Sequence, residues 1–244
     1  MATRNMPLVI AHRGASGTAP ENTMAAFRQA VEMGADMIEL DVQRTKDGQV
    51  VVIHDATLER TTNGSGAVRE LTYAEIEQLD AGSWFGEGQE FAGERVPLLK
   101  EVLEFTKGKC ALNIEIKNIP YADPGIEQAV VDLLHETGFP LEQVIISSFD
   151  HSCLHRIARL EPNVPTACLF SHYPASLAGL DTGILHPSWQ VIRPEFMSWV
   201  RESGRKVNVW TVDKPERWAW LLEAGVDGII TNYPARLIAY LREN

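Results

Sequence analysis

The sequence predicts an α/β protein folded as a (β/α)8 barrel, also called a TIM barrel. Short apolar runs rich in β-branched residues alternate with helical patterns along the whole chain of 244 residues. Such alternation indicates a parallel sheet, and eight parallel strands close a barrel. An open, doubly wound sheet is the alternative. Its dinucleotide-binding form carries a GxGxxG pattern after the first strand, and this chain has none there.

The expected elements follow from these runs in order. We predict strands at residues 8–12, 37–42, 111–117, 144–149, 166–170, 183–186, 206–212 and 228–231. A ninth run, residues 50–54, is read as an extension or hairpin of the second strand. We predict helices at residues 23–33, 72–79, 98–105, 125–137, 152–160, 194–203, 215–223 and 235–241.

Two further features concern the organisation of the chain. The segments EMGADMI and EAGVDGI place Gly34 and Gly225 where a helix ends, each followed by an aspartate and a strand, as in repeated units. Residues 55–97 are irregular and rich in glycine, which is typical of a functional excursion. We expect one domain over residues 1–244, with a small insertion after the second strand at about 55–97.

Charge and hydropathy argue against several classes of function. The net charge is −11 and no basic run is present, which argues against nucleic acid and against stable association with an anionic membrane. The apolar stretches are far shorter than a spanning helix or a signal peptide needs. We expect a cytoplasmic protein in which Cys110, Cys153 and Cys168 are reduced and buried.

Carboxylates inside apolar strands are the sharpest feature. Because side chains alternate along a strand, Glu39 and Asp41 share one face of IELDV while the aliphatic residues share the other. In IEIK, Glu115 and Lys117 share a face in the same way. Three carboxylates inside a barrel suit one divalent cation, Mg²⁺ or Ca²⁺, because both prefer oxygen ligands. Ordinary surface acids or a structural ion pair are the alternatives.

Two histidines lie at strand ends, where a barrel carries its active site. His12 is followed by Arg13, which is suited to gripping a phosphate, and His54 follows an apolar run. For a phosphodiester substrate, the two imidazoles would serve as general acid and general base. Arg13 and Lys117, together with the cation, would neutralise the phosphate oxygens.

Four more residues are candidates for substrate contact. Glu21 and Asn22 precede the first helix, where capping the helix is the alternative role. His186 ends a strand, and Trp210 follows an apolar run as a wall for the alcohol, with core packing as the alternative. The remaining histidines are expected to be exposed: His135, His151, His155 and His172.

Taken together, the segments AHRG, PENT, IELDV, VVIHD, NIEIK and GVDGII resemble, in order and spacing, the glycerophosphodiester phosphodiesterase family. The resemblance covers essentially the whole chain. It implies a (β/α)8 barrel that hydrolyses glycerophosphodiesters, such as glycerophosphocholine or glycerophosphoethanolamine, to sn-glycerol 3-phosphate and an alcohol in glycerophospholipid catabolism.

The resemblance also implies roles for individual residues. Glu39, Asp41 and Glu115 would hold the divalent cation, and His12 and His54 would be the acid/base pair. Arg13 and Lys117 would contact the phosphate. Asn232 departs from the family pattern, where we expect Asp in many relatives, and we expect this departure to matter little.

Other functions remain open at this stage. A phospholipase-like lyase would release a cyclic phosphate, a non-catalytic barrel would bind a headgroup without turnover, and a sugar-phosphate enzyme would hold phosphate after the last two strands. The preferred alcohol, the choice between Mg²⁺ and Ca²⁺, the acid and base assignments and the oligomeric state are not determined by the sequence.

Overall fold

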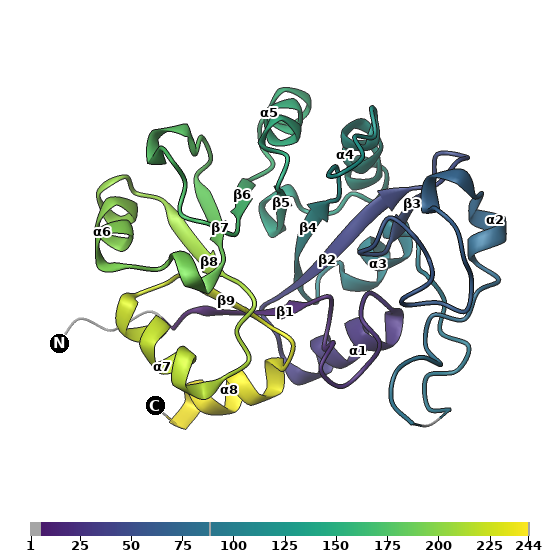
Figure 1. Ribbon diagram of the computed structural model, residues 1–244, viewed down its shortest axis with the longest axis horizontal. Helices are drawn as coiled ribbons and strands as arrows, with labels where there is room; N and C mark the ends of the chain where they lie inside the picture. Colours follow the sequence, from purple (N-terminus) through teal and green to yellow (C-terminus); the bar gives the residue numbers. More distant parts are fainter. Residues whose placement is uncertain (1–5, 88, 244) are drawn as a thin grey trace.

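The computed structural model describes residues 6–87 and 89–243, and it confirms the barrel (Figure 1). Parallel pairing runs around the ring in the order β1-β9-β8-β7-β6-β5-β4-β2, and pairing of β1 with β2 closes it. The barrel strands are β1 (Leu8–His12), β2 (Met37–Arg44), β4 (Ala111–Ile116), β5 (Val144–Ser148), β6 (Thr166–Phe170), β7 (Ile184–Pro187), β8 (Lys206–Val209) and β9 (Gly228–Thr231). The short strand β3 (Val50–Val52) pairs antiparallel with β2, so the ninth run is a hairpin outside the ring.

Helices cover the outside of the ring, except α2 (Tyr73–Ile76), which belongs to the segment beside the barrel (Figure 1). The others are α1 (Met24–Met33), α3 (Leu99–Thr106), α4 (Ile126–Thr137), α5 (His151–Leu160), α6 (Pro194–Glu202), α7 (Pro215–Ala224) and α8 (Pro234–Glu243). Single 3₁₀ turns lie at η1 (Val68–Glu70), η2 (Leu141–Gln143), η3 (Leu177–Gly179) and η4 (Trp189–Val191). The helix expected at residues 72–79 is one turn long. It starts at a Thr72–Glu75 capping box and then tightens, because Leu79 N donates to Ile76 O across 3.1 Å.

The repeated Gly-x-Asp segments have the same structural role in both places. Gly34 (φ 80°) and Gly225 (φ 76°) end their helices in the left-handed conformation that favours glycine. Two residues later, Asp36 accepts a hydrogen bond from Val9 N and Asp227 from Val207 N, each across 2.8 Å. Each aspartate therefore fixes the loop between a helix and its following strand to a neighbouring strand.

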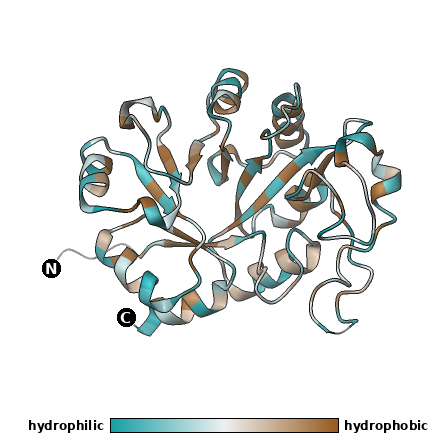
Figure 2. Cartoon of the chain, in the orientation of Figure 1, coloured by the Kyte–Doolittle hydropathy of each residue, from teal (hydrophilic) through white to brown (hydrophobic). Residues whose placement is uncertain are grey.

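Apolar side chains pack on both sides of the strands. Ile38, Leu40 and Val42 belong to the main core between barrel and helices, and Figure 2 shows apolar residues along the barrel strands. Inside the ring a smaller cluster fills the barrel: Ile10, Met37, Ile145, Ala167 and Ile230. The polar side chains of the candidate site lie on the carboxyl-terminal side of this apolar cluster.

The segment between β3 and α3 lies beside the barrel next to β2 and β3 (Figure 1). Turns make up most of it, and it has its own apolar cluster: Val51, Ile53, Leu58, Val68, Ile76, Ala81 and Val96. The segment thus packs as a small unit against the hairpin, which places it near the ends of β2 and β4.

Two further expectations concern the cysteines and membrane-spanning helices. The three cysteines are buried and none forms a disulfide within the described ranges. Across residues 6–87 and 89–243, no helix combines the length and the apolar character needed to cross a membrane.

Candidate active site

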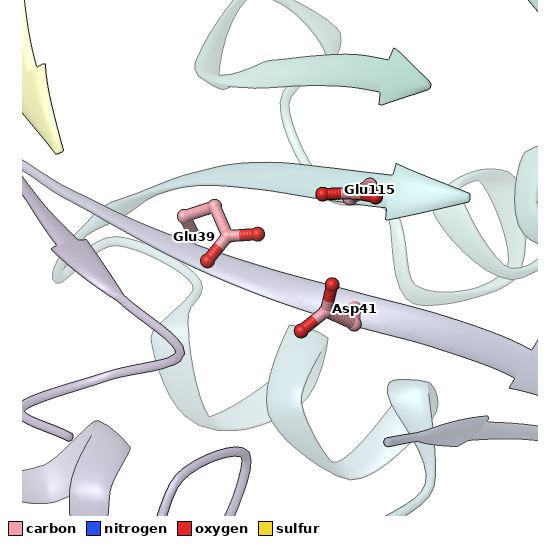
Figure 3. Close-up of side chains that lie close together, drawn as sticks. All are labelled: Glu39, Asp41 and Glu115. Carbon is pink, nitrogen blue, oxygen red and sulfur yellow. The ribbon is translucent and has the colours of Figure 1, made fainter. Parts of the chain in front are cut away.

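Three carboxylates from the neighbouring strands β2 and β4 converge on one another (Figure 3). Asp41 and Glu115 are partners in the register of β2 and β4, and Glu39 lies two residues before Asp41 on the same face. One oxygen from each side chain lies within 4.8 Å of the others, and all three residues are buried. The period of two along a strand therefore produces the convergence that the sequence predicts.

Their charges are strongly coupled. Burial and the neighbouring carboxylates raise the pKa of Glu39 well above its usual value, and burial and Asp41 raise that of Glu115 to about 7. For Asp41, burial alone would raise the pKa, but Arg13 and Lys117 outweigh it and lower the pKa. Asp41 Oδ1 accepts no hydrogen bond from the described residues. The carboxylate oxygens of the triad are buried, and neighbouring cations neutralise their negative charge only in part. Such a set of oxygen ligands suits a hard divalent cation.

Arg13 connects these acids to the end of β1. Its backbone N donates to Glu39 Oε2 across 2.9 Å, and its Nε lies 3.1 Å from Asp41 Oδ2. Its φ of 55° is unusual for a residue other than glycine and costs about 1–3 kcal/mol. The contacts with two buried carboxylates hold Arg13 in this conformation.

Glu21 and Asn22 contact Arg13 and Asp41. Glu21 accepts a hydrogen bond from Arg13 Nη1 across 2.7 Å and two from Arg60. Asn22, which also has a positive φ (58°), donates to Asp41 Oδ2 across 2.9 Å. The cap of α1 is Thr23. Glu21 thus contacts Arg13, and Asn22, which is buried, contacts Asp41.

Lys117 follows β4 and lies on the carboxylate side of the site. Its Nζ is 2.6 Å from Glu115 Oε1 and 3.6 Å from Asp41 Oδ1. Burial opposes its charge, but these carboxylates outweigh burial and raise the pKa of Lys117. Lys117 therefore remains charged beside the triad.

The two histidines flank the carboxylates and have different neighbours. His12 Nε2 lies 3.9 Å from Glu39 Oε2, while its Nδ1 is 2.7 Å from the amide oxygen of Asn232. Burial, reinforced by Arg13, lowers the pKa of His12 to about 4. His54 Nδ1 is 2.6 Å from Asp55 Oδ1. Burial also lowers the pKa of His54, although Asp41 and Asp55 oppose the shift.

Asn232, which departs from the family pattern, contacts His12 directly. The amide nitrogen of its side chain donates to Asp213 Oδ2 across 2.7 Å, and its backbone N donates to Asp213 Oδ1 across 2.8 Å. Ser16 Oγ donates to the same amide oxygen that faces His12, across 2.8 Å. Its place directly after the last barrel strand, which pairs with the strand of His12, is the signal that could have identified it.

Trp210 and His186 lie at different depths. Trp210 lines a cavity of about 240 Å³ that also contains the triad edge and both histidines, and its ring meets Phe149 edge-on at 5.6 Å. His186 is completely buried, with ring nitrogens facing Asn113 (3.5 Å) and Asn208 (3.0 Å). We therefore correct the expectation for His186: it lies beneath the cavity and offers no surface to a substrate.

The other histidines agree with expectation except His151. His135, His155 and His172 are exposed. His151 is half-buried, and its Nε2 lies 3.0 Å from Leu169 O.

Fold and site together define a (β/α)8 barrel with an acidic, cation-accepting centre and two imidazoles at its active face. Residues 12–236 match the model of the glycerophosphoryl diester phosphodiesterase family. A glycerophosphodiester phosphodiesterase from Caldanaerobacter subterraneus subsp. tengcongensis is 47% identical over 97% of this chain and 98% of its own length. The chain belongs to this family.

Solved structures agree with this assignment. A phosphodiesterase from Oleispira antarctica, in complex with the product sn-glycerol-3-phosphate, is 33% identical and superposes with a TM-score of 0.89 over 97% of both chains. A glycerophosphodiester phosphodiesterase from Agrobacterium tumefaciens is 32% identical, with a TM-score of 0.83 over 96% of this chain and 100% of that one.

Proposed function

We propose that this protein hydrolyses glycerophosphodiesters, glycerophosphocholine and glycerophosphoethanolamine among them, to sn-glycerol 3-phosphate and an alcohol in glycerophospholipid catabolism. The observation that carries the proposal is the arrangement of His12 and His54 around one buried carboxylate triad, with two cationic side chains beside it. Family membership and the product bound to the Oleispira relative support the same substrate class.

The positive groups account for binding of an anionic diester. Arg13 and Lys117 line the cavity beside the triad, so both can approach phosphate oxygens. Glu39, Asp41 and Glu115 are the residues that would hold one divalent cation, and their oxygen-only donors accept either Mg²⁺ or Ca²⁺. When bound, the cation would supply Lewis-acid stabilisation of charge on the phosphate.

The neighbours of the two histidines suggest which is base and which is acid. The amide oxygen of Asn232 can only accept a hydrogen bond, so His12 carries its proton on Nδ1 and presents an unprotonated Nε2. Burial lowers the pKa of both histidines, but the hydrogen bond of His54 to the carboxylate of Asp55 opposes that shift and favours its protonated form. We therefore assign His12 as the general base and His54 as the general acid that protonates the departing alcohol.

The organisation of the chain is part of the proposal. We propose a single domain over residues 1–244, with the segment at about 55–97 inserted in it. The small apolar cluster of that segment includes Val51 of β3, so the segment and the barrel share a packed boundary. Its position next to His54 gives it a role in forming one side of the site.

The experiment is release of sn-glycerol 3-phosphate from glycerophosphocholine, followed by an enzymatic assay of the product. We expect release that stops when a chelator is added and returns with excess Mg²⁺ or Ca²⁺. Accumulation of a stable cyclic phosphate would instead indicate the lyase reaction. Binding of the diester with the cation present and with no turnover would indicate a headgroup-binding barrel.

A further inference from the structure

A second cavity adjoins the site. Its volume is about 680 Å³, and it shares His54 and Lys117 with the inner cavity, whereas His12 lines only the inner one of the two. One wall comes from residues 43–46 at the end of β2, together with residues 54–57, Ala67 and Arg69. The other wall comes from Lys117 and residues 119–123, which follow β4. A molecule that extends from the phosphate position past His54 would enter this second cavity.

The lining of the second cavity carries an excess of positive charge. Its basic side chains are Arg44, Lys46, Arg69 and Lys117, and its acidic side chains are Asp55 and Asp123. Both acids are already paired, because Asp55 contacts His54 and Arg60, and Asp123 contacts Arg44. Arg44 pairs with Asp123 and Lys117 pairs with Glu115, so the excess positive charge of the lining is carried by Lys46 and Arg69, in a protein whose net charge is −11.

Two of these cations are exposed and have little or no compensation. Lys46 forms no ion pair within 4.0 Å among the described residues, and its charge interacts with Glu75 at longer range. Arg69 has Glu70 at 4.0 Å, at the limit of an ion pair. The Arg69 guanidinium lies 4.2 Å from the centre of the Tyr121 ring, so one face of this exposed aromatic ring is occupied by a cation. A quaternary ammonium group would meet positive charge here instead of an open aromatic face.

We propose that this second cavity binds the departing alcohol and favours alcohols that carry an anionic group, such as a second phosphodiester. This inference rests on the proposed function and narrows its substrate class. Hydrolysis breaks the bond between phosphorus and the alcohol oxygen; water adds to phosphorus, and the alcohol leaves with a proton. His54 lies between the two cavities, where a proton donor to that oxygen is needed.

The test compares kcat/KM for three glycerophosphodiesters whose departing alcohols differ in charge. Bis(glycerophospho)glycerol releases an anionic alcohol, glycerophosphoglycerol a neutral one and glycerophosphocholine a cationic one. We expect kcat/KM to fall in that order, and the contrast to shrink as salt is added, because exposed charges are screened. Lys46→Gln and Arg69→Gln each remove one positive charge. Each should lower kcat/KM about two- to fivefold for the substrate with the anionic departing alcohol, with a smaller effect for the neutral alcohol.

Lys109→Gln is the matched control, because it removes one exposed positive charge just before β4, at the opposite end of the barrel. It should leave all three values unchanged. Equal or higher kcat/KM for glycerophosphocholine, or equal effects of Lys46→Gln and Lys109→Gln, would overturn the inference while the proposed function stands. Failure to hydrolyse any of the three would overturn both.

Discussion

The side-chain oxygen of Asn232 lies 2.7 Å from His12 Nδ1, joining the loop after the last barrel strand to the end of the first. The side-chain amide of Asn232 cannot exchange its oxygen and nitrogen positions by rotation, because its nitrogen donates a hydrogen bond to the carboxylate of Asp213. The orientation of Asp213 thus fixes the amide, and the amide fixes the proton on the imidazole. His12 is held with Nε2 toward the carboxylates.

Replacing Asn232 should separate orientation from folding. We expect Asn232→Leu to lower kcat about ten- to hundredfold, as for a lost partner of a reacting group, with little change in KM. Asn232→Asp should move the acidic limb of the kcat/KM profile to higher pH, because a carboxylate facing Nδ1 favours protonated His12. An unchanged profile in Asn232→Asp together with normal kcat in Asn232→Leu would show that the contact is only structural.

The acid and base assignments can be tested with the departing group. On an alkyl glycerophosphodiester, His12→Ala and His54→Ala should each lower kcat by about 10²–10⁴-fold. On glycerophospho-p-nitrophenol, whose alcohol departs without needing a proton, His54→Ala should recover most of its rate and His12→Ala should not. Recovery by His12→Ala instead would reverse the assignments.

Cation binding should depend on pH. The pKa of Glu115 is raised to about 7, so in the cation-free protein this carboxyl keeps its proton at lower pH. A cation must displace that proton, so its affinity should increase as the pH rises through about 7. Calorimetric titrations of the natural protein in buffers of different ionisation enthalpy should detect the released proton. Affinity independent of pH would contradict this linkage.

Gly14, beside Arg13, should tolerate no side chain. Its φ is 81°, and a Cβ there would lie 2.7 Å from the backbone of Ala26 in α1. Gly14→Ala should lower the free energy of unfolding by about 1–2 kcal/mol for the left-handed backbone and by about 1–3 kcal/mol for overpacking. Gly34→Ala is the control, because Gly34 has a φ of 80° and nothing within 4 Å of its Cβ position. Equal losses of stability in urea denaturation would rule out the packing contribution.

Local patterns in the sequence were enough to predict the barrel and the convergence of the acids. The two-residue period of IELDV and NIEIK places Glu39, Asp41 and Glu115 on interior faces, and parallel register brings Asp41 beside Glu115. The single-turn length of α2 was not predictable, because its end depends on how Leu79 packs within the irregular segment.

The contacts that depend on closure of the ring were missed. Asn232 contacts His12 although the two residues are 220 positions apart in the sequence, and no local sequence pattern predicts such a contact. The depth of His186 inside the barrel and the positive φ of Asn22 likewise depend on tertiary packing. Charged residues at strand ends are therefore easier to predict from the sequence than the residues that orient them.

The stoichiometry of divalent cation binding, measured by isothermal titration calorimetry, tests most directly whether the three carboxylates form one cation site. We expect one Mg²⁺ or Ca²⁺ per chain in the natural protein, with binding lost in Glu39→Gln and Glu115→Gln and retained in the exposed control Glu142→Gln. Binding that survives both triad substitutions, or its absence from the natural protein, would contradict the account.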